Sequence, residues 1–578
     1  MSMNMHATVE HRKLVATAAA IIFAWFTAAF GQWPDIFGLT VETDPAAALP
    51  VASLVHMPVH LADDVMISLR SGYMETITGR PAFNRTDVAQ PSTSYLTPYL
   101  FATLLNLMQL NAAVWAYALL GLIATAATMG LIVWRARATV QGLLMAFALC
   151  CTSTNLEFAL NGWDHLFQAP FLVAATILAL DVSLTSIGIL SVSLLLVLGS
   201  LFRPDGLLIS LAIIVAMVMP AGRLRRVMLL CALPYSLMMA GFLAFNAHLF
   251  SHITPTTARL KFGSSPSWPY SLHYAVSNGL LTYSAISVLL ALIGLYAIFR
   301  RVLPDRRLLV VLIGCVLTAS VALYNSDVFP GARMFWVPTC VFCAAMAALL
   351  PECLLLNPSQ AISLTAYSRG QIAASSASWT LRISQWVVIA LALLWVSEAL
   401  VSPIVNQAKR AVIRTVNIQK SSTARQYLFA HWISEHLNPR DGPIALSYLG
   451  MGFHMPQFEI ADLLGKADER IATSPIKWGP PGHNKWDIDA TLEKWRPQAF
   501  VIDVRTDFHD QNVLHDAQTA LATKQDMAFR AALILNPRVQ QEYTYCRLTD
   551  IGFGIPDRQG FLLRRDVAAR QEESVTCH

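Results

Sequence analysis

The sequence predicts a polytopic α-helical membrane protein that ends in a soluble α/β domain. The chain has 578 residues, of which 55% are hydrophobic and only 13% are charged. Soluble domains carry roughly 25% charged residues, so this chain cannot hide its apolar surface in one soluble core. Long apolar runs continue to about residue 405, and from Asn406 an ordinary soluble composition returns. We therefore expect a membrane domain over residues 1–405 and a soluble domain over residues 406–578.

Apolar runs long enough to cross a bilayer recur along the first part of the chain. A membrane helix needs roughly 20 apolar residues, and by that length we count about eleven candidates. The first covers about residues 14–31, after a basic flank that would also suit a signal peptide. It is long for a signal peptide, and many spans follow it. The other candidates centre near Gly121, Phe147, Ala174, Leu194, Ala212, Met238, Leu290, Val316, Ala345 and Leu391.

Arginine residues indicate which ends of these spans face the cytoplasm, because cytoplasmic loops are enriched in Lys and Arg. An inside N-terminus places most loop arginines inside, and an odd number of spans then places the C-terminal domain outside. The loops concerned hold Arg135, Arg137, Arg223, Arg225, Arg226, Arg300, Arg301, Arg306, Arg307, Arg369 and Arg382. The net charge of +5 is mild. We interpret these cations as topology signals and expect no nucleic-acid partner.

A long outer loop, residues 33–111, follows the first span. Its apolar stretch over residues 96–110 begins among prolines, so we expect a helix that lies at the membrane interface and does not cross the bilayer. Counting this stretch as a span would place Arg135 outside, against the charge bias.

The C-terminal part mixes strand-like and helical patterns. Residues 443–448 and 499–503 are short apolar runs typical of buried strands. Residues 491–495 and 516–532 have a helical pattern. An α/β layered domain is the expected result.

The cysteines indicate no metal site. Cys340 and Cys343 form a C-x-x-C pair, but they lie in an apolar run without a second pair or a nearby histidine. Cys546 and Cys577 lie in the soluble domain. They could form a disulfide if that domain is outside the cytoplasm, and the sequence leaves the pairing open.

Asp63 and Asp64 are adjacent carboxylates in the first outer loop. Apolar residues recur at helical spacing after them until Gly79, so we expect a helix that begins near the pair. One aspartate could simply be the N-cap of that helix, but capping does not explain two. Charged groups beside a bilayer are costly and mark sites of chemistry. The pair suits a general base with a partner that binds an acceptor hydroxyl or tunes its pKa.

Further polar clusters fall on the same predicted side of the membrane. Trp163 and Asp164 end one loop, where the tryptophan could instead belong to an interfacial aromatic belt. Arg203 stands in an Arg-Pro-Asp-Gly turn, which a local pair with Asp205 explains well.

Two more clusters carry cations. Arg259 and Lys261 lie on the outer side against the usual charge bias, so an anion such as a lipid phosphate is a sensible partner. Asp327 and Arg333 lie at the edge of a span, where the alternative is a single interfacial salt bridge.

Carboxylates and cations on one side of a membrane suit sugar transfer from a polyprenyl phosphate. A carboxylate would activate the acceptor hydroxyl or stabilise an oxocarbenium-like centre, and Arg or Lys would neutralise the departing phosphate. A transporter or flippase would instead predict paired half-domains or charges within the spans. An envelope scaffold would have no use for these clusters.

The ordered set of motifs resembles integral-membrane glycosyltransferases of the GT-C class. In its finer pattern it resembles the mycobacterial terminal arabinofuranosyltransferase family. The matching segments are Asp63-Asp64, residues 69–73, Gly79, Asn84, residues 92–94, residues 203–206, residues 255–257 with Lys261, residues 327–333, residues 450–452, residues 462–465 and residues 482–485. Two positions depart from the family pattern, since Asp164 replaces a glutamate and Val328 replaces an aromatic residue.

The resemblance implies transfer of a pentofuranose, arabinofuranose in the first place, from a polyprenyl-phosphate donor to a cell-envelope glycan. The reaction would take place at the outer face of a bacterial inner membrane, with Asp63 and Asp64 as central carboxylates. Donor phosphate or sugar would be bound by Lys261, Arg259, Arg333, Asp327, Arg203 and Asp164. The acceptor side would include His483, Lys485 and Trp163. The alternative for His483 and Lys485 is a satisfied surface histidine and a solvated lysine.

Other assignments stay open at this stage. The donor could carry another sugar, and the acceptor could be lipopolysaccharide or a surface protein such as pilin. Inversion and retention of the anomeric configuration are both compatible with the motifs. Two carboxylates could hold a divalent metal with waters, but nothing in the spacing requires one, and we predict no metal or other cofactor.

Overall fold

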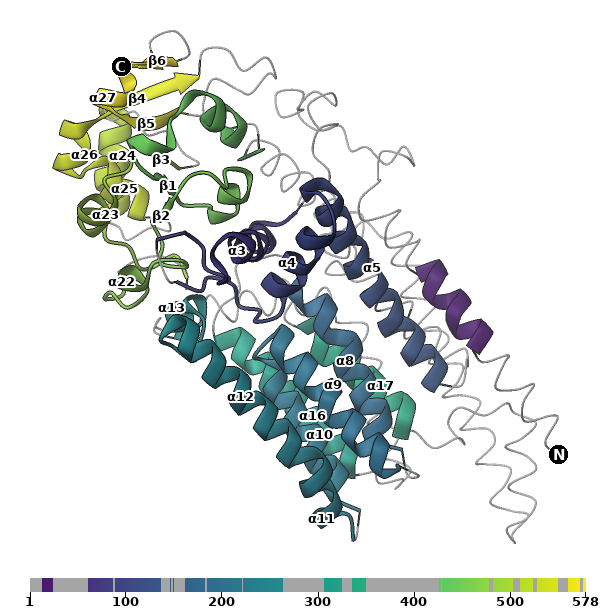
Figure 1. The fold of residues 1–578 in the computed structure, drawn as a ribbon. Helices are drawn as coiled ribbons and strands as arrows, with labels where there is room; N and C mark the ends of the chain where they lie inside the picture. The colour runs from purple at the N-terminus through teal and green to yellow at the C-terminus, as the bar shows by residue number, and fades with distance from the viewer. Residues whose placement is uncertain are drawn as a thin grey trace, which may run out of the picture.

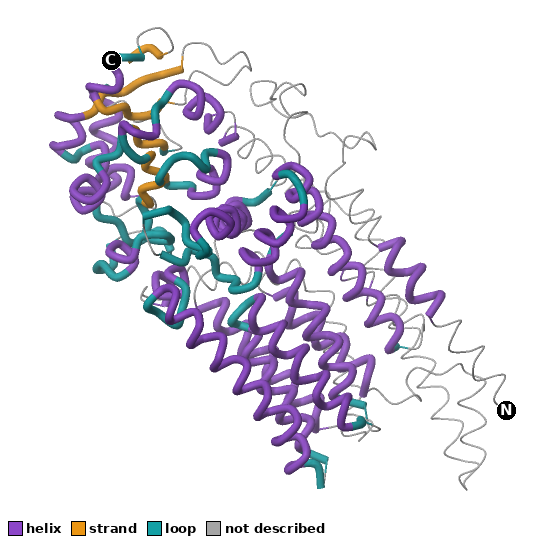
Figure 2. The backbone as a smooth tube through the Cα atoms, viewed as in Figure 1, coloured by secondary structure: helices purple, strands orange, loops and turns teal. Residues whose placement is uncertain are grey.

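The computed structural model joins a helical bundle to an α/β domain (Figures 1 and 2). It describes residues 13–23, 61–86, 89–136, 146, 149, 162–181, 184–220, 222–262, 306–324, 335–349, 426–427, 429–477, 482–502, 510–522, 528–548, 560–571 and 575–577. Helices α3 (Asp63–Thr78) and α4 (Thr97–Leu107) of the first loop lie between the two parts (Figure 1).

Helix α3 begins where the sequence predicts a helix after the aspartate pair. Its N-cap is Ala62, which makes no side-chain capping bond, so the N-cap interpretation of Asp63 or Asp64 is wrong. Both carboxylates instead occupy the first turn, where the positive end of the helix dipole favours them. The helix ends at Gly79, whose φ of 71° suits glycine and whose N–H donates to Glu75 O. The predicted stop at Gly79 is therefore confirmed.

The bundle is made of apolar helices that coincide with predicted spans. Their bounds are α5 (Leu110–Arg135), α8 (Asp164–Ala179), α9 (Ser186–Phe202), α10 (Gly206–Val218), α11 (Leu224–Val227), π-helical η3 (Met228–Ala232), α12 (Leu233–Phe250), α16 (Arg306–Tyr324) and α17 (Trp336–Leu349). A further helix covers residues 13–23, within the first predicted span. The predicted spans near Leu290 and Leu391, and most of the one near Phe147, lie outside the described residues. Helix α4 has eleven residues, too few to cross a bilayer, and it is separate from α5 as predicted.

The outward faces of the bundle are apolar. Of the described helices, Leu110–Arg135 and the continuous Leu224–Phe250 are long and apolar enough to cross a membrane. In the most apolar stretch of Leu224–Phe250, only 17% of the residues are buried within the protein. A core helix of a soluble protein would be mostly buried. Side chains such as Leu237 are more than half exposed on this face. An apolar face of this extent requires an apolar surrounding, which a bilayer provides.

The two ends of the bundle differ in charge. Helix α8 begins beside α4, where Asp164 accepts a bond from Thr97, and it ends at Leu180, whose carbonyl accepts from Arg307. At this same far end Arg226 donates to Ser186 at the start of α9. Arg226 and Arg307, two of the arginines that the sequence assigns to cytoplasmic loops, therefore lie at the end of the bundle away from α3 (Figure 1).

The C-terminal domain is built on a six-stranded mixed sheet in the order β2-β1-β3-β5-β4-β6. The first three strands in this order are parallel, and the other pairings are antiparallel. The strands are β1 (Ile444–Leu446), β2 (Ile460–Asp462), β3 (Ala499–Val501), β4 (Tyr543–Leu548), β5 (Gly560–Arg564) and β6 (Val575–Cys577). The 3-10 helices are η6 (Pro439–Asp441) and η7 (Leu449–His454), and the α-helices are α22 (Glu469–Ala472), α23 (Ile488–Trp495), α24 (Gln511–Ala522), α25 (Ala528–Ile534), α26 (Pro537–Glu542) and α27 (Arg565–Ala568).

These elements confirm the α/β prediction and both predicted strands. The predicted helix over residues 516–532 is represented by parts of α24 and α25, with residues 523–527 outside the description. Cys546 and Cys577, which face each other across β4 and β6, form a disulfide. The predicted boundary at residues 405 and 406 lies outside the described residues.

Two buried side chains of the first loop attach the domain to the bundle. The Arg70 guanidinium donates to Phe83 O at 2.9 Å, to Met455 O at 3.2 Å, to Phe458 O at 2.7 Å and to Gly452 O. Burial lowers the pKa of Arg70 to about 9. Asn84 donates to Ile460 O at 2.8 Å and accepts from Ile460 N–H at 2.9 Å, so its amide pairs with β2 as another strand would. The segment after α3 is therefore part of the domain's packing.

Candidate active site

Asp63 reaches from the first turn of α3 to the helix η7. Its Oδ1 accepts a hydrogen bond from the Gly450 N–H at 2.7 Å. An added Cβ at Gly450 would lie 2.6 Å from that oxygen and 2.9 Å from Asp63 Cα. These distances are below the range that carbon contacts tolerate, so glycine at position 450 allows the close approach. The glycine-rich match at residues 450–452 thus has a structural reason.

Lys466 is the cation that faces both carboxylates. Its Nζ lies 3.3 Å from Asp64 Oδ1 and 3.7 Å from Asp63 Oδ2. The side chain of Lys466 is 11% exposed, against 15% for Asp63 and 27% for Asp64. Two carboxylates of the first loop and one lysine of the C-terminal domain therefore form a single, largely buried ionic cluster.

The chain delivers Lys466 through a tight loop after β2. The buried Asp462 carboxylate closes that loop by accepting from Leu464 N–H at 2.8 Å and from Ala467 N–H. Gly465 has a φ of 81°, which suits glycine. Burial raises the pKa of Asp462 to about 6, although both of these N–H groups oppose the shift. The Asp-Leu-x-Gly motif therefore forms the loop that positions the next residue, Lys466.

The charges of the cluster shift one another's pKa. Burial raises the pKa of Asp63 above its ordinary value, and the neighbouring Asp64 adds to the rise. Lys466 and the Gly450 N–H act in the opposite direction. Burial alone would lower the pKa of Lys466, but the two carboxylates outweigh it and the net shift is upward. Lys466 therefore stays protonated while the proton affinity of Asp63 is increased.

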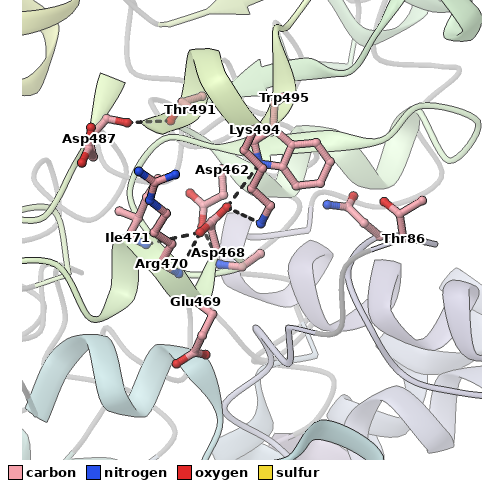
Figure 3. A network of polar contacts seen from close by, with 12 residues as sticks. Thr86, Asp462, Asp468, Glu469, Arg470, Ile471, Asp487, Thr491, Lys494 and Trp495 are labelled. Atoms are coloured by element: carbon pink, nitrogen blue, oxygen red, sulfur yellow. Dashed lines mark hydrogen bonds and ion pairs between the residues drawn. The ribbon is translucent and has the colours of Figure 1, made fainter. Parts of the chain in front are cut away.

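Behind Lys466, a second polar network holds the loop in place (Figure 3). Asp468 caps α22 by accepting from the N–H groups of Arg470 and Ile471. Its other oxygen accepts from Lys494 Nζ at 2.8 Å and from Trp495 Nε1 at 3.2 Å. Helix α23 thus fixes the residue two positions after Lys466.

Arg259 and Lys261 lie on α13 (Thr256–Phe262), next to the C-terminal domain. The Arg259 guanidinium forms an ion pair with Glu469, and His252 Nε2 lies 3.9 Å from the same carboxylate. The Lys261 side chain passes Gly482, with its Cε 3.8 Å from the place of an added Cβ. The structure therefore brings this predicted donor-binding segment to the base of α22, close to the His483 segment.

The other predicted residues have contacts of different kinds. Lys485 is buried and donates to Ala472 O at 2.7 Å, which ties it to α22; the solvated-lysine alternative is wrong. Arg203 pairs with Asp205 at 3.1 Å within its own turn, as the structural alternative expects. Asp164 accepts from Thr97 Oγ1 at 2.7 Å at the start of α8.

Trp163 is 2% exposed and packs in the bundle core near His165, so the interfacial-belt interpretation is wrong. Asp327 and Arg333 lie outside the described residues. Across the described part of the chain, no group of three or more His, Cys, Asp or Glu side chains is arranged to hold a metal ion.

Sequence reasoning missed Lys466 and the Gly450 N–H. The signals available were the two motifs that carry them, Gly-Met-Gly and Asp-Leu-Leu-Gly-Lys. Nothing in the sequence says that these motifs meet at Asp63, which lies 387 residues before Gly450.

Fold and site together describe an apolar helical bundle joined to an α/β domain. A lysine of that domain forms ion pairs with two carboxylates of the first loop. No family model matches the chain, and no curated protein sequence matches it. Among solved structures, apo ArnT from Cupriavidus metallidurans is similar over 89% of this chain and 96% of its own, with 14% identity and a TM-score of 0.45.

Two oligosaccharyltransferase structures from Archaeoglobus fulgidus are also similar. The one tethered with an acceptor peptide matches 95% of this chain and 74% of its own, with 12% identity and a TM-score of 0.44. The other, named AglB and in complex with an inhibitory peptide and a dolichol-phosphate, matches 93% and 73%, with 13% identity and a TM-score of 0.41. At these values the likenesses carry no conclusion about substrate or reaction.

Proposed function

We propose that this chain is an integral-membrane glycosyltransferase of the GT-C class that takes a sugar from a polyprenyl-phosphate donor. The observation that carries the proposal is the Asp63–Asp64–Lys466 cluster between the bundle and the α/β domain. A polyprenyl chain would lie along the apolar outer face of the bundle. Its phosphate and sugar would then reach the end of the bundle where the carboxylates and the cations of α13 gather.

The chemistry follows from the charges. The acceptor hydroxyl oxygen bonds to the anomeric carbon, and the bond from that carbon to the phosphate oxygen breaks. The bonding electrons leave with the polyprenyl phosphate, and a carboxylate takes the hydroxyl proton. Lys466 contacts both carboxylates. Asp64 is the more exposed of the pair and is the candidate base, while Asp63 also accepts the Gly450 N–H. This assignment applies to an inverting transfer.

The leaving phosphate needs a cation, because negative charge develops on it as the bond breaks. Lys261 is the leading candidate among the described residues, since its side chain extends toward the Gly482 turn. Arg259 can serve only if it exchanges Glu469 for the phosphate. Arg333 stays a proposed partner from the sequence motifs.

The finer assignment is transfer of arabinofuranose to a cell-envelope glycan, supported by the ordered motif resemblance. Transfer of another polyprenyl-linked sugar, or transfer to lipopolysaccharide or a surface protein, is the alternative within the same class. An outer location of the α/β domain is supported by the arginines at the opposite end of the bundle and by the Cys546–Cys577 disulfide. The proposed membrane is the bacterial inner membrane.

Transfer by purified protein tests the proposal. Full-length protein in nanodiscs is incubated with polyprenyl-phosphoryl arabinose, or with other polyprenyl-linked sugars, and a short glycan acceptor. The parent is compared with Asp63→Ala/Asp64→Ala and with Asp489→Ala/Asp516→Ala, which removes two exposed carboxylates of α23 and α24. We expect transfer by the parent and the control pair, and none by the folded Asp63→Ala/Asp64→Ala variant. Equal transfer by all three would reject the site.

A further inference from the structure

We propose that the Lys466 ammonium is the built-in cation of the carboxylate pair, in the place that a divalent metal ion would otherwise take. The inference deepens the proposed function, because it assigns the charge that the site uses and makes transfer independent of added metal. Lys466 is a positioning residue in this role, since it acts on the two carboxylates and not on the reacting sugar.

The position of the ammonium between two different side chains supports this assignment. Lys466 Nζ lies within 4 Å of one oxygen from each aspartate. Two carboxylates held close together raise each other's pKa, and a nearby cation opposes that rise and favours the ionised pair. Hard divalent cations bind carboxylate oxygens in the same way, so Lys466 and a metal ion would compete for one place.

The lysine is held rigidly and is not a mobile surface side chain. The Asp462 loop and the α22 cap at Asp468 fix the backbone on both sides of it. The side chain is 11% exposed. Burying an ammonium group costs free energy unless it is paired with an opposite charge, and here the two carboxylates pair with it.

Among the described residues, few other groups act on the charge of Asp63. Helix α3 contributes Asp64, η7 contributes the Gly450 N–H, and the loop after β2 contributes Lys466 with Asp462 behind it. Lys466 is the cation that lowers the proton affinity of Asp63 among these groups. Its removal would take away the ammonium that offsets the two negative charges, so the carboxylates would take up either a proton or a metal ion.

Manganese binding and the pH profile test this proposal in the full-length protein. Electron paramagnetic resonance measures bound Mn²⁺ for the parent, Lys466→Met, Lys466→Arg and Lys466→Met/Asp63→Asn/Asp64→Asn. Arg470→Met is the matched control, because it removes an exposed cation four residues away. Transfer is measured with and without EDTA, and the acid limb of kcat/KM is recorded.

We expect the parent, Lys466→Arg and Arg470→Met to bind no Mn²⁺ at the cluster and to keep transfer in EDTA. Lys466→Met should gain a Mn²⁺ site that the added Asn substitutions abolish. Its acid limb should move up by about one pH unit or more, as expected for two carboxylates without a cation.

Mn²⁺ bound at Asp63 and Asp64 in the parent, or transfer lost in EDTA and restored by Mn²⁺, would overturn the proposal. So would a Lys466→Met variant with the parent's Mn²⁺ binding and acid limb. If no donor is turned over, the proposed function fails, but Mn²⁺ binding still decides the role of Lys466. If Lys466→Met does not fold, Mn²⁺ binding by the parent decides it.

Discussion

The bundle and the α/β domain place their apolar residues in opposite ways. Helix α12 carries exposed Leu233 and Leu237, whereas the strand β5 of the domain is buried along its whole length. The bundle therefore needs an apolar surrounding, whereas the domain buries apolar side chains in a core of its own. The candidate site lies where the two arrangements meet. There the first loop provides carboxylates and the domain provides the partners that stabilise them.

The largest expected effect tests whether the domain is held to the bundle by Arg70. Arg70→Met removes the guanidinium donor from Phe83 O and Phe458 O, whereas Gly452 O and Met455 O keep a backbone N–H donor. Each unsatisfied buried group costs about 1–3 kcal/mol, so we expect a loss of about 3–5 kcal/mol in the free energy of unfolding of the domain. Chemical denaturation followed by domain fluorescence measures it. Arg85→Met, which removes an exposed arginine from the same segment, is the control. Equal stability of the two variants would show that Arg70 does not join the parts.

The next effect is a pH dependence that belongs to the domain alone. Burial raises the pKa of Asp462 from 3.8 to about 6, so the folded domain binds this proton more tightly than the unfolded chain does. The tighter proton binding stabilises the folded domain fully below pH 3.8, and this stabilisation is lost as the pH rises through about 6. The difference corresponds to about 3 kcal/mol.

Asp462→Asn removes this titration. The unfolding free energy of the parent minus that of Asp462→Asn should therefore fall between acid pH and pH 7, as measured by denaturation at several pH values. A pH-independent difference between the two proteins would contradict the raised pKa.

A substitution at Gly450 should lower activity more than it lowers the stability of the fold. Gly450→Ala places a methyl group against Asp63, whose carboxylate must then shift from its position beside Lys466 and the Gly450 N–H. A misplacement of about 1 Å costs about 100-fold in rate, so we expect kcat to fall by about that factor. Gly241→Ala, at a position of α12 where an added Cβ meets no atom within 4 Å, tests whether any glycine substitution has this effect. If Gly450→Ala turned over substrate at nearly the rate of the parent, the Gly450 N–H would not be part of the active site.

The smallest effect concerns the surface of the domain. Arg470 and Glu493 form a pair at 3.4 Å in which both side chains are more than half exposed. Exposed pairs contribute about 0–1 kcal/mol, so Arg470→Met should leave the free energy of unfolding nearly unchanged. A loss as large as that of Arg70→Met would mean that charge placement at the surface, and not at the junction, holds the domain.

Much of the local structure could be predicted because its signals are local. The stop of α3 at Gly79 depends on one residue that tolerates a positive φ, and the sequence shows that residue directly. The helices of the bundle follow from apolar runs, and the strands β1 and β3 follow from short apolar segments between turns. Lys485 shows where this reasoning stops. A charged residue after Gly482 suggested contact with a ligand or with solvent, but folding buries its ammonium against Ala472 O.

The sequence by itself determined the apolar helices of the bundle, the shared position of Arg226 and Arg307 at one end of it, and the carboxylate pair in the first turn of α3. Hydrophobic periodicity and turn chemistry act over a few residues, so they can be seen in the sequence alone. Only the tertiary structure decided the partners of that pair. Lys466 lies 402 residues after Asp64, and Gly450 lies 387 residues after Asp63. Such contacts depend on how β2 and η7 pack against the first loop, and no local pattern encodes that packing.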